Sequence, residues 1–325
     1  MGTSIQSLLL KQGFEVKTLK RWHINNPLTK KDLANPKKNF WSNPEVLEGA
    51  DAVIHLAGAN VGNPWTAQHK QEIISSRIEG TYDLVALIKN CQNPPKRLVC
   101  ASAIGYYQDP CSDLLTETGA MGTGFLTQVC SAWENEAQKI DEVCELYTIR
   151  IGLVLSNRSK LLQAAYYQYI FSGMVGSTGN PCNVWSWIHI LDLAEIFVQS
   201  STGKIPSGIY NGVAPQPTTQ KNVGLAVENH PLNIAHGNTV LRLLQTLGDV
   251  LNGFWRSMRW LTGGKRLQIR PIVPSWVMRM AWGDRSVLAL TNQRVSSQKL
   301  HSVGFNFQFP DIDSAIQHLS QNPKV

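Results

Sequence analysis

Apolar and polar positions in the first half of the chain alternate between helical and strand-like spacing. Helical spacing is expected at residues 3–12, 66–90 and 125–140, and short strand-like runs at 14–19, 52–56, 97–102 and 147–155. The first helix should end at Gly13, because glycine is typical of helix C-termini. Strands that alternate with helices predict βαβ units with right-handed crossovers. The expected fold class is therefore α/β, with a doubly wound parallel sheet.

The first expected element is a helix rather than a strand. A doubly wound nucleotide-binding domain normally starts with a strand and a Gly-rich turn, followed by the helix whose N-terminus faces the pyrophosphate. Here Gly2 leads directly into the helix. We therefore expect that the first strand and the Gly-rich turn are missing, as in a truncated product or gene model.

Composition predicts a globular protein with one large and one smaller lobe. The chain has 325 residues, of which 43% are hydrophobic and 16% charged, enough for a sizeable core. We assign residues 1–155, with 185–215 returning to them, to the large domain, and 156–184 and 216–325 to the smaller lobe. No run reaches the roughly 18 apolar residues of a membrane span. These features favour a cytoplasmic protein with no membrane partner.

The charge balance and the cysteines exclude some classes of partner. The net charge is +7, but the basic residues are spread out and accompany no recognition motif, so nucleic-acid binding is not expected. An anionic cofactor explains a mild positive bias equally well. The six cysteines are scattered without a CxxC pair, which predicts neither a disulfide framework nor a metal site. The oligomeric state is not predicted.

Several blocks of sequence, in the right order, resemble the epimerase-like subgroup of atypical short-chain dehydrogenases/reductases. The blocks are Gly2-Thr3, Gly13-Phe-Glu-Val16, Leu47 to Gly58, Ser76-Arg-Ile-Glu-Gly-Thr81, Ala101 to Tyr107, Trp133-Glu134, Arg150 to Leu155, Trp185 to Ile190, Tyr210 to Pro215 and Gln293 to Pro310. The resemblance implies a Rossmann-like domain and a smaller C-terminal α/β lobe that covers the substrate. An insert near 223–252 has no counterpart, and its apolar spacing predicts an amphipathic helix or a surface excursion.

A pair of cations suggests which dinucleotide the chain would take. Lys20 and Arg21 follow the expected strand 14–19, where an NAD enzyme usually carries an acidic residue for the ribose 2′-hydroxyl. A guanidinium can instead pair with a 2′-phosphate, so NADP is preferred over NAD. The alternative is an ordinary solvated Lys-Arg pair.

Other cofactor contacts are expected at the end of the strand 52–56 and nearby. Gly58 leaves room for the cofactor to approach the backbone. The resemblance implies further contacts from Leu56 and Ala57 after this strand, from Glu72 and Arg77 on the next helix, and from Val154, and it places Gly2 at the pyrophosphate. A surface role is the alternative for Arg77.

The usual acid and base of short-chain dehydrogenases are absent. These enzymes need a Tyr, a Lys and a Ser, and Ser102 at a strand end can supply the last. The Tyr-x-x-x-Lys positions are occupied by Leu126 and Cys130. Tyr106 or Tyr107 beside Ser102 could supply a phenol, and His189 an imidazole; packed aromatic and structural roles are the alternatives.

These residues leave three functional hypotheses. The first is an NADP-dependent oxidoreductase or epimerase that acts on a small, unidentified substrate. The second is a non-catalytic NADPH-binding sensor or scaffold, which the missing Tyr and Lys favour. The third is a truncated, inactive isoform, because loss of a central strand exposes sheet edges.

Overall fold

The fold is built around a four-stranded parallel sheet. The structure is a computed structural model that describes residues 1–20, 41–107, 114–140, 142–159, 162–163, 184–232, 276, 280, 283–290, 292–323 and 325. The strand order is β1 (Ala52–His55), β2 (Arg97–Ala103), β4 (Glu145–Ile151) and β8 (Gly208–Gly212), and each neighbouring pair is parallel. The predicted α/β fold with a parallel sheet is confirmed.

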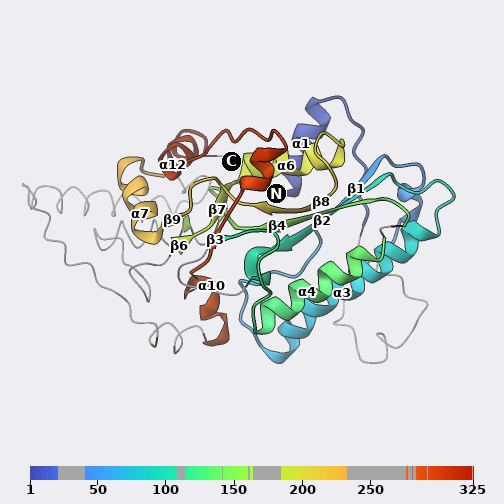
Figure 1. Cartoon of the computed structure of the whole chain (residues 1–325), viewed down its shortest axis with the longest axis horizontal. Helices are drawn as coiled ribbons and strands as arrows, with labels where there is room; N and C mark the ends of the chain where they lie inside the picture. Colours follow the sequence, from blue (N-terminus) through green and yellow to red (C-terminus); the bar gives the residue numbers. More distant parts are fainter. Residues whose placement is uncertain are drawn as a thin grey trace, which may run out of the picture.

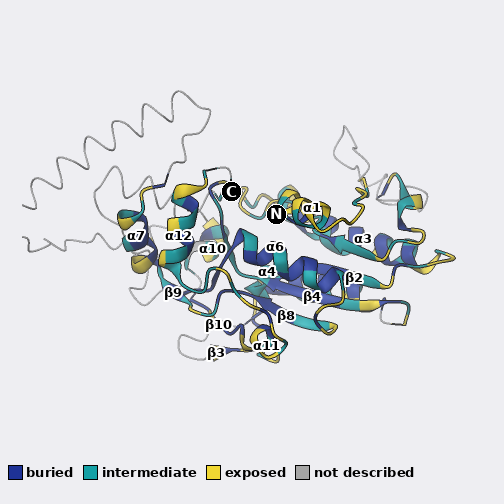
Figure 2. Cartoon of the chain, turned by 90° about the horizontal axis from the view of Figure 1, so that it is seen from above, coloured by how far each residue is buried: buried dark blue, intermediate teal, exposed yellow. Residues whose placement is uncertain are grey.

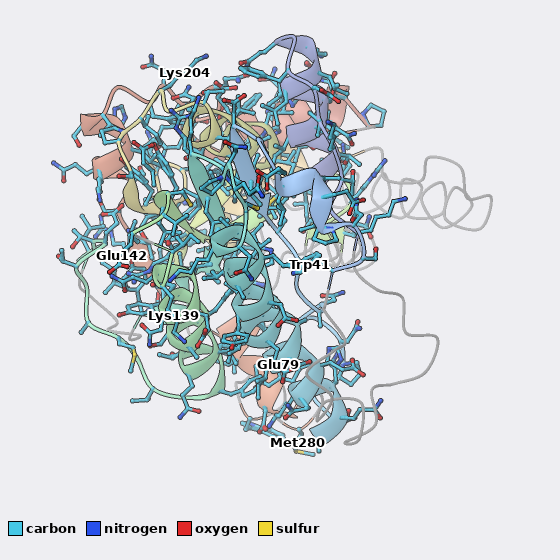
Figure 3. The ribbon with its side chains drawn as sticks, turned by 90° about the vertical axis from the view of Figure 1, so that its right-hand side faces the viewer. Trp41, Glu79, Lys139, Glu142, Lys204 and Met280 are labelled. Atoms are coloured by element: carbon cyan, nitrogen blue, oxygen red, sulfur yellow. The ribbon has the colours of Figure 1, made fainter. Side chains whose placement is uncertain are left out.

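Helices cover both faces of this sheet (Figure 1). On one face α1 (Gly2–Lys11) packs against α6 (Ile190–Ser201), and on the other α3 (Ala67–Lys89) packs against α4 (Phe125–Gln138). Figure 3 shows α3 and α4 side by side, with Glu79 on α3 and Lys139 at the end of α4. Because both faces are covered, buried residues gather along β2, β4 and α6 (Figure 2).

Capping residues set the limits of the helices. The side chain of Thr66 accepts a hydrogen bond from the backbone of His69, so the pattern at 66–90 forms one helix, α3. Helix α1 is followed by Gly13, whose φ of 85° lies in the left-handed region that favours glycine. Both helix boundaries therefore follow from local sequence.

The strand expected at 14–19 is a wrong prediction. Residues 14–20 join no sheet; instead the Asn43 side chain donates to the Thr18 carbonyl and accepts from the Lys20 amide, at 3.0 and 2.6 Å. Side-chain bonds therefore replace a strand ladder there. Among the described residues β1 pairs only with β2, so residues 14–19 form no ladder with β1. The Ser42 amide donates to the Lys20 carbonyl at 2.8 Å, which is a single backbone bond and not a ladder.

The single strand expected at 147–155 is divided in two. Strand β4 ends at Ile151, and β5 (Leu153–Leu155) pairs instead with β7 (Trp187–His189). Gly152 lies between them, where a Cβ atom would collide with the backbone carbonyl of Ser186. The close approach of these two backbones therefore requires glycine and redirects the strand.

A second apolar cluster lies beside the sheet. Helices α7 (Gln220–Asn229) and α12 (Ile312–Gln321) pack together there. Val223 and Val227 are buried in this cluster, so the start of the expected 223–252 insert is part of a core and not a surface excursion. Residues 233–252, including the expected amphipathic helix, lie outside the described residues.

Shorter elements complete the described chain. They are η1 (Pro44–Leu47), η2 (Ile104–Tyr106), β3 (Leu114–Leu115), β6 (Val184–Trp185), β9 (Thr218–Thr219), η3 (Gly283–Ser286), α10 (Val287–Leu290), β10 (Arg294–Val295) and α11 (Gln298–Ser302). Strand β10 pairs with β3, and β6 with β9. The C-terminal strand β10 therefore pairs with a strand from the first half of the chain.

None of the helices that the structure describes has the length and apolarity to cross a membrane. The described cysteines form no disulfide bond; they are Cys91, Cys100, Cys130 and Cys144. In the same ranges, no three His, Cys, Asp or Glu side chains are grouped closely enough to hold a metal ion.

A neutral histidine pair joins the end of β7 to α12. His189 is fully buried, and its Nδ1 accepts the backbone N–H of Leu191 at 3.1 Å, which caps α6. The ring proton therefore lies on Nε2, which donates to Nδ1 of His318 at 3.2 Å. Burial, and secondarily His318, lower the pKa of His189 to about 3; burial also lowers the pKa of His318.

This pair should make stability fall in acid. A histidine with a lowered folded-state pKa contributes stability that is complete above about pH 6.5 and is lost as the pH falls toward 3. Urea unfolding at pH 7 and pH 4.5 should show a loss for the wild type that His189→Asn reduces by on the order of 2 kcal/mol. Asn keeps an acceptor for the α6 cap, and equal losses in the two proteins would contradict this assignment.

Candidate active site

The end of β1 faces both helical layers and the start of α1. Leu56 packs with the cluster that contains α1 and α6, whereas Ala57 packs with the cluster on the α3 and α4 side. A Cβ atom on Gly2 would lie 3.8 Å from Cδ1 of Leu56. The N-terminus of α1 therefore meets the carboxyl end of β1, where backbone N–H groups and the helix dipole favour an anion.

Gly58 makes room for the guanidinium of Arg77. A Cβ atom on Gly58 would lie 2.9 Å from the Cζ and Nη2 atoms of Arg77. The Nη1 atom of Arg77 donates to the carbonyls of Ala59 and Ile73, at 3.1 and 3.4 Å, and Arg77 forms no ion pair with a described residue. Burial lowers its pKa. A largely buried cation without a carboxylate partner, beside an exposed glycine backbone, suits an anionic ligand.

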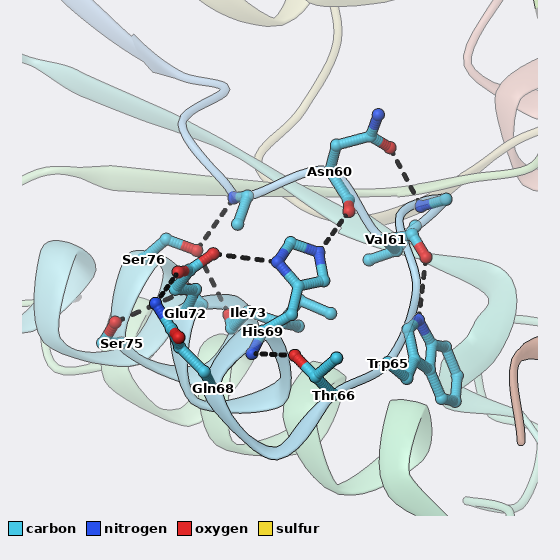
Figure 4. Close-up of polar contacts among 12 residues, drawn as sticks. Asn60, Val61, Trp65, Thr66, Gln68, His69, Glu72, Ile73, Ser75 and Ser76 are labelled. Atoms are coloured by element: carbon cyan, nitrogen blue, oxygen red, sulfur yellow. Dashed lines mark hydrogen bonds and ion pairs between the residues drawn. The ribbon is translucent and has the colours of Figure 1, made fainter. Parts of the chain in front are cut away.

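Side chains of α3 hold the loop that follows Gly58 (Figure 4). Ser76 Oγ accepts the amide of Ala59 at 2.9 Å. His69 contacts the Asn60 carbonyl through Nε2 and Glu72 through Nδ1, each at 2.8 Å. These two acceptors raise the pKa of His69. Glu72 thus positions the loop through His69.

The C-terminal region also holds this loop. Lys70 on α3 pairs with Asp284 of η3 at 2.6 Å, and Arg285 donates to the Gly62 carbonyl at 3.1 Å. Exposed ion pairs of this kind contribute little stability individually. They nevertheless place η3 directly beside the loop that follows β1.

A buried ion pair lies at the ends of the neighbouring strands. Ser102, Arg150 and Asn211 are direct neighbours across β2, β4 and β8. Arg150 binds both carboxylate oxygens of Glu134 on α4, through Nε at 2.9 Å and Nη2 at 2.7 Å. Ser102 donates to the same carboxylate at 2.6 Å. The Arg150 and Glu134 side chains are only 3% and 12% exposed, so this geometry is shielded from water.

Tyr107 is tied into the same network. Its hydroxyl accepts from Nη1 of Arg150 at 3.0 Å and donates to Oδ1 of Asn211 at 2.6 Å. The residue is 2% exposed, and burial raises its pKa, opposed by Arg150. The structure thus brings Ser102 and Tyr107 together, but with both hydroxyls bonded to protein groups.

The remaining predicted residues are dispersed. Lys20 is exposed, and Arg21 lies outside the described residues. Val154 on β5 is half-buried beside Ile188 of β7, one residue from His189. No described contact joins His189 to Ser102. The catalytic and cofactor roles of these residues stay predictions.

The sequence patterns above assign no role to Glu134 or Arg150, although both lie in blocks that resemble the family. The signal was available in the spacing: Leu126, Cys130 and Glu134 follow one another at four-residue intervals on α4, so they share one helix face. The polar group that α4 presents to Ser102 is therefore a carboxylate.

The comparisons with known proteins agree with this architecture. Residues 1–211 match the model of the NAD dependent epimerase/dehydratase family. The chain belongs to this family. Residues 273–319 match a domain of unknown function, DUF1731.

Relatives share this organisation over nearly the whole chain. An epimerase family protein of Staphylococcus aureus (strain MRSA252) is 28% identical over 323 residues, covering 98% of this chain and 95% of that protein. The chloroplastic SDR39U1 homologue of Arabidopsis thaliana is 28% identical, covering 88% of this chain and 72% of that protein. The solved structure of human epimerase family protein SDR39U1 with NADPH has a TM-score of 0.73 at 23% identity and covers 99% and 96% of the two chains. This likeness establishes the Rossmann-like fold.

Removal of one partner of the buried ion pair should cost more stability than removal of one partner of an exposed pair. Glu134→Gln leaves the Arg150 charge buried without its partner, which should lower the free energy of unfolding by about 3 kcal/mol. Urea unfolding measures this loss. Glu136→Gln on the same helix is the matched control, because Glu136 pairs with the half-exposed Lys139 and should contribute less than about 1 kcal/mol. Equal losses for the two variants would contradict the assignment.

Proposed function

We propose that this chain is an NADP-dependent oxidoreductase or epimerase of the extended short-chain dehydrogenase type, acting on a small substrate. The observation that carries the proposal is the convergence of the α1 N-terminus, the exposed Gly58 and the Arg77 guanidinium at the carboxyl end of β1. Ligands of open α/β sheets bind at this edge. Membership of the NAD dependent epimerase/dehydratase family supports the same placement.

The residues present fit a dinucleotide. The absence of a Gly58 side chain lets the Arg77 guanidinium lie against the backbone there. Together with the α1 N-terminus, Arg77 offers positive charge to phosphate groups. Leu56 and Ala57 supply apolar contact between these groups. When bound, the nicotinamide would supply or accept a hydride. The protein side chains would hold the substrate and exchange its proton.

NADP is proposed over NAD on two grounds. Lys20 and Arg21 offer two cations where an acidic residue would select the unphosphorylated ribose. The solved human relative SDR39U1 was obtained with NADPH. Hydrogen bonds fix the backbone of Lys20: its amide donates to Asn43 Oδ1, and its carbonyl accepts from Ser42 Oγ.

A non-catalytic NADPH-binding sensor or scaffold is the second candidate. It is favoured by one observation: the hydroxyls of Ser102 and Tyr107 are both bonded to protein groups. A sensor would retain the cofactor site, and the contacts between η3 and the Gly58 loop would link cofactor binding to the C-terminal region.

Cofactor affinity tests the proposed binding. Replacing both Lys20 and Arg21 by Ser should weaken NADPH binding by about 10-fold or more and leave NADH binding within about twofold, because only NADPH carries the 2′-phosphate. Fluorescence titration with NADPH and, separately, with NADH measures the two dissociation constants. An unchanged ratio of the two affinities would remove the argument for NADP.

Two glycine variants test the placement of the cofactor. Gly58→Ala should weaken the binding of NADPH and of NADH to the same extent, because the new methyl group displaces the Arg77 guanidinium. Gly62→Ala in the same loop is the control, since its methyl meets only the end of the Asn60 side chain at 3.2 Å. If both variants bind like the wild type, the cofactor does not use this loop.

Turnover separates the enzyme from the sensor. The enzyme should oxidise NADPH with at least one member of a panel of carbonyl compounds and nucleotide sugars, and Ser102→Ala should reduce that rate by about 100-fold. Absorbance at the NADPH band follows the reaction. NADPH binding without turnover on any member would favour the sensor.

A further inference from the structure

We propose that Tyr106 and Arg150 replace the missing Tyr-x-x-x-Lys pair, with Tyr106 as the catalytic phenol and Arg150 as the cation that stabilises its phenolate. This assignment deepens the proposed oxidoreductase or epimerase function and rests on it. Four observations carry it: the position of Tyr106, a hydroxyl that no described residue bonds, the stacking of Arg150 on its ring, and the fixed placement of that guanidinium.

Tyr106 lies where the usual phenol is lost. It ends η2, immediately after β2 and four residues after Ser102. Leu126 occupies the usual Tyr position on α4, and its Cβ lies 3.6 Å from where a Cβ atom on Gly105 would be. The residue next to Tyr106 therefore packs against the position from which the family's usual tyrosine projects.

The two adjacent phenols differ in availability. Tyr107 is 2% exposed, with its hydroxyl bonded to Arg150 and Asn211. Tyr106 is half-buried, and no described residue makes a hydrogen bond to its hydroxyl. A phenol that exchanges a proton with a substrate oxygen needs that access. Tyr107, the other of the two phenols that the sequence offers, serves instead to hold Arg150 and Asn211.

Arg150 supplies the cation. Its Cζ atom lies 3.6 Å from the centre of the Tyr106 ring, the distance of direct stacking. The guanidinium cannot lose its proton at any relevant pH. Its two bonds to Glu134 fix it in place, and they use the Nε and Nη2 edge, which leaves the planar face to the ring. Glu134 is therefore a positioning residue, which holds the guanidinium and offsets part of the positive charge of Arg150.

The chemistry balances without any further reactant. In the reducing direction a bound nicotinamide would supply the hydride for the carbonyl carbon of the substrate, and Tyr106 gives its phenolic proton to the carbonyl oxygen. The product is an alcohol, and the phenolate remains beside Arg150 until water returns a proton. Stabilising that charge by a group already in position lowers the barrier to proton transfer. Oxidation of an alcohol follows the same steps in reverse.

Acetylation by N-acetylimidazole tests the availability of the Tyr106 hydroxyl without a turnover assay. The folded, full-length protein is acetylated, and the modified tyrosines are then mapped by peptide mass spectrometry. Tyr106 should be acetylated and Tyr107 should not, with Tyr82, 58% exposed, as the internal reference. Saturating NADPH should slow acetylation of Tyr106 at least threefold and leave Tyr82 unchanged. Equal acetylation of Tyr106 and Tyr107 overturns the proposal and needs no variant.

Two variants test the role of Arg150. Glu134→Gln combined with Arg150→Gln removes both charges together, so neither is left buried alone. This pair should slow acetylation of Tyr106 at least threefold relative to Tyr82. Arg150→Lys, which keeps the charge but loses the planar stack, should fall between the pair and the wild type. An unchanged Tyr106 rate in both variants overturns the proposal.

NADPH fluorescence separates this result from the proposed function. If NADPH binds but Tyr106 is acetylated at the same rate with and without it, the Tyr106 assignment falls and cofactor binding stands. If NADPH does not bind, the proposed function falls, and with it the catalytic role of Tyr106.

Discussion

The bidentate bond between Arg150 and Glu134 is the interaction on which the candidate site depends. It joins β4 to α4, and through Ser102, Tyr107 and Asn211 it reaches β2 and β8. A buried ion pair contributes little net stability compared with apolar residues, but removal of one partner is costly. Its value here is positional. It fixes a permanent cation at the carboxyl ends of three parallel strands, within stacking distance of Tyr106.

A second set of contacts shapes the neighbouring half of the same edge. Arg77 lies against Gly58, and α3 side chains bond the backbone of the following loop. Residues of η3 also reach this region, because Asp284 pairs with Lys70 of α3 and Arg285 donates to the Gly62 carbonyl in the loop. In the proposed function the two halves have different roles: Arg77 and the α1 N-terminus would attract phosphate, and the Arg150 network would hold the groups beside the substrate.

Local sequence patterns predict the elements that do not depend on contacts with residues distant in the sequence. The α1, α3 and α4 helices and strands β1 and β2 follow from periodicity, Thr66 and Gly13. Residues 14–19 alternate like a strand, but a strand also needs a neighbouring strand to pair with. Here the Asn43 side chain bonds the backbone of Thr18 and Lys20 instead. The break at Gly152 depends on the Ser186 backbone, which no local pattern contains. Ser102 was predicted near the site. Its dependence on Glu134 was not, because the contact joins residues 32 positions apart.

The central claim is that the carboxyl edge of the sheet is one dinucleotide and substrate site, and amide hydrogen exchange with saturating NADPH tests it most directly. The account predicts slower exchange at the start of α1, in the loop after Gly58 and around η2, with α12 unchanged. Protection confined to other regions, or none at these three while NADPH is bound, would contradict it.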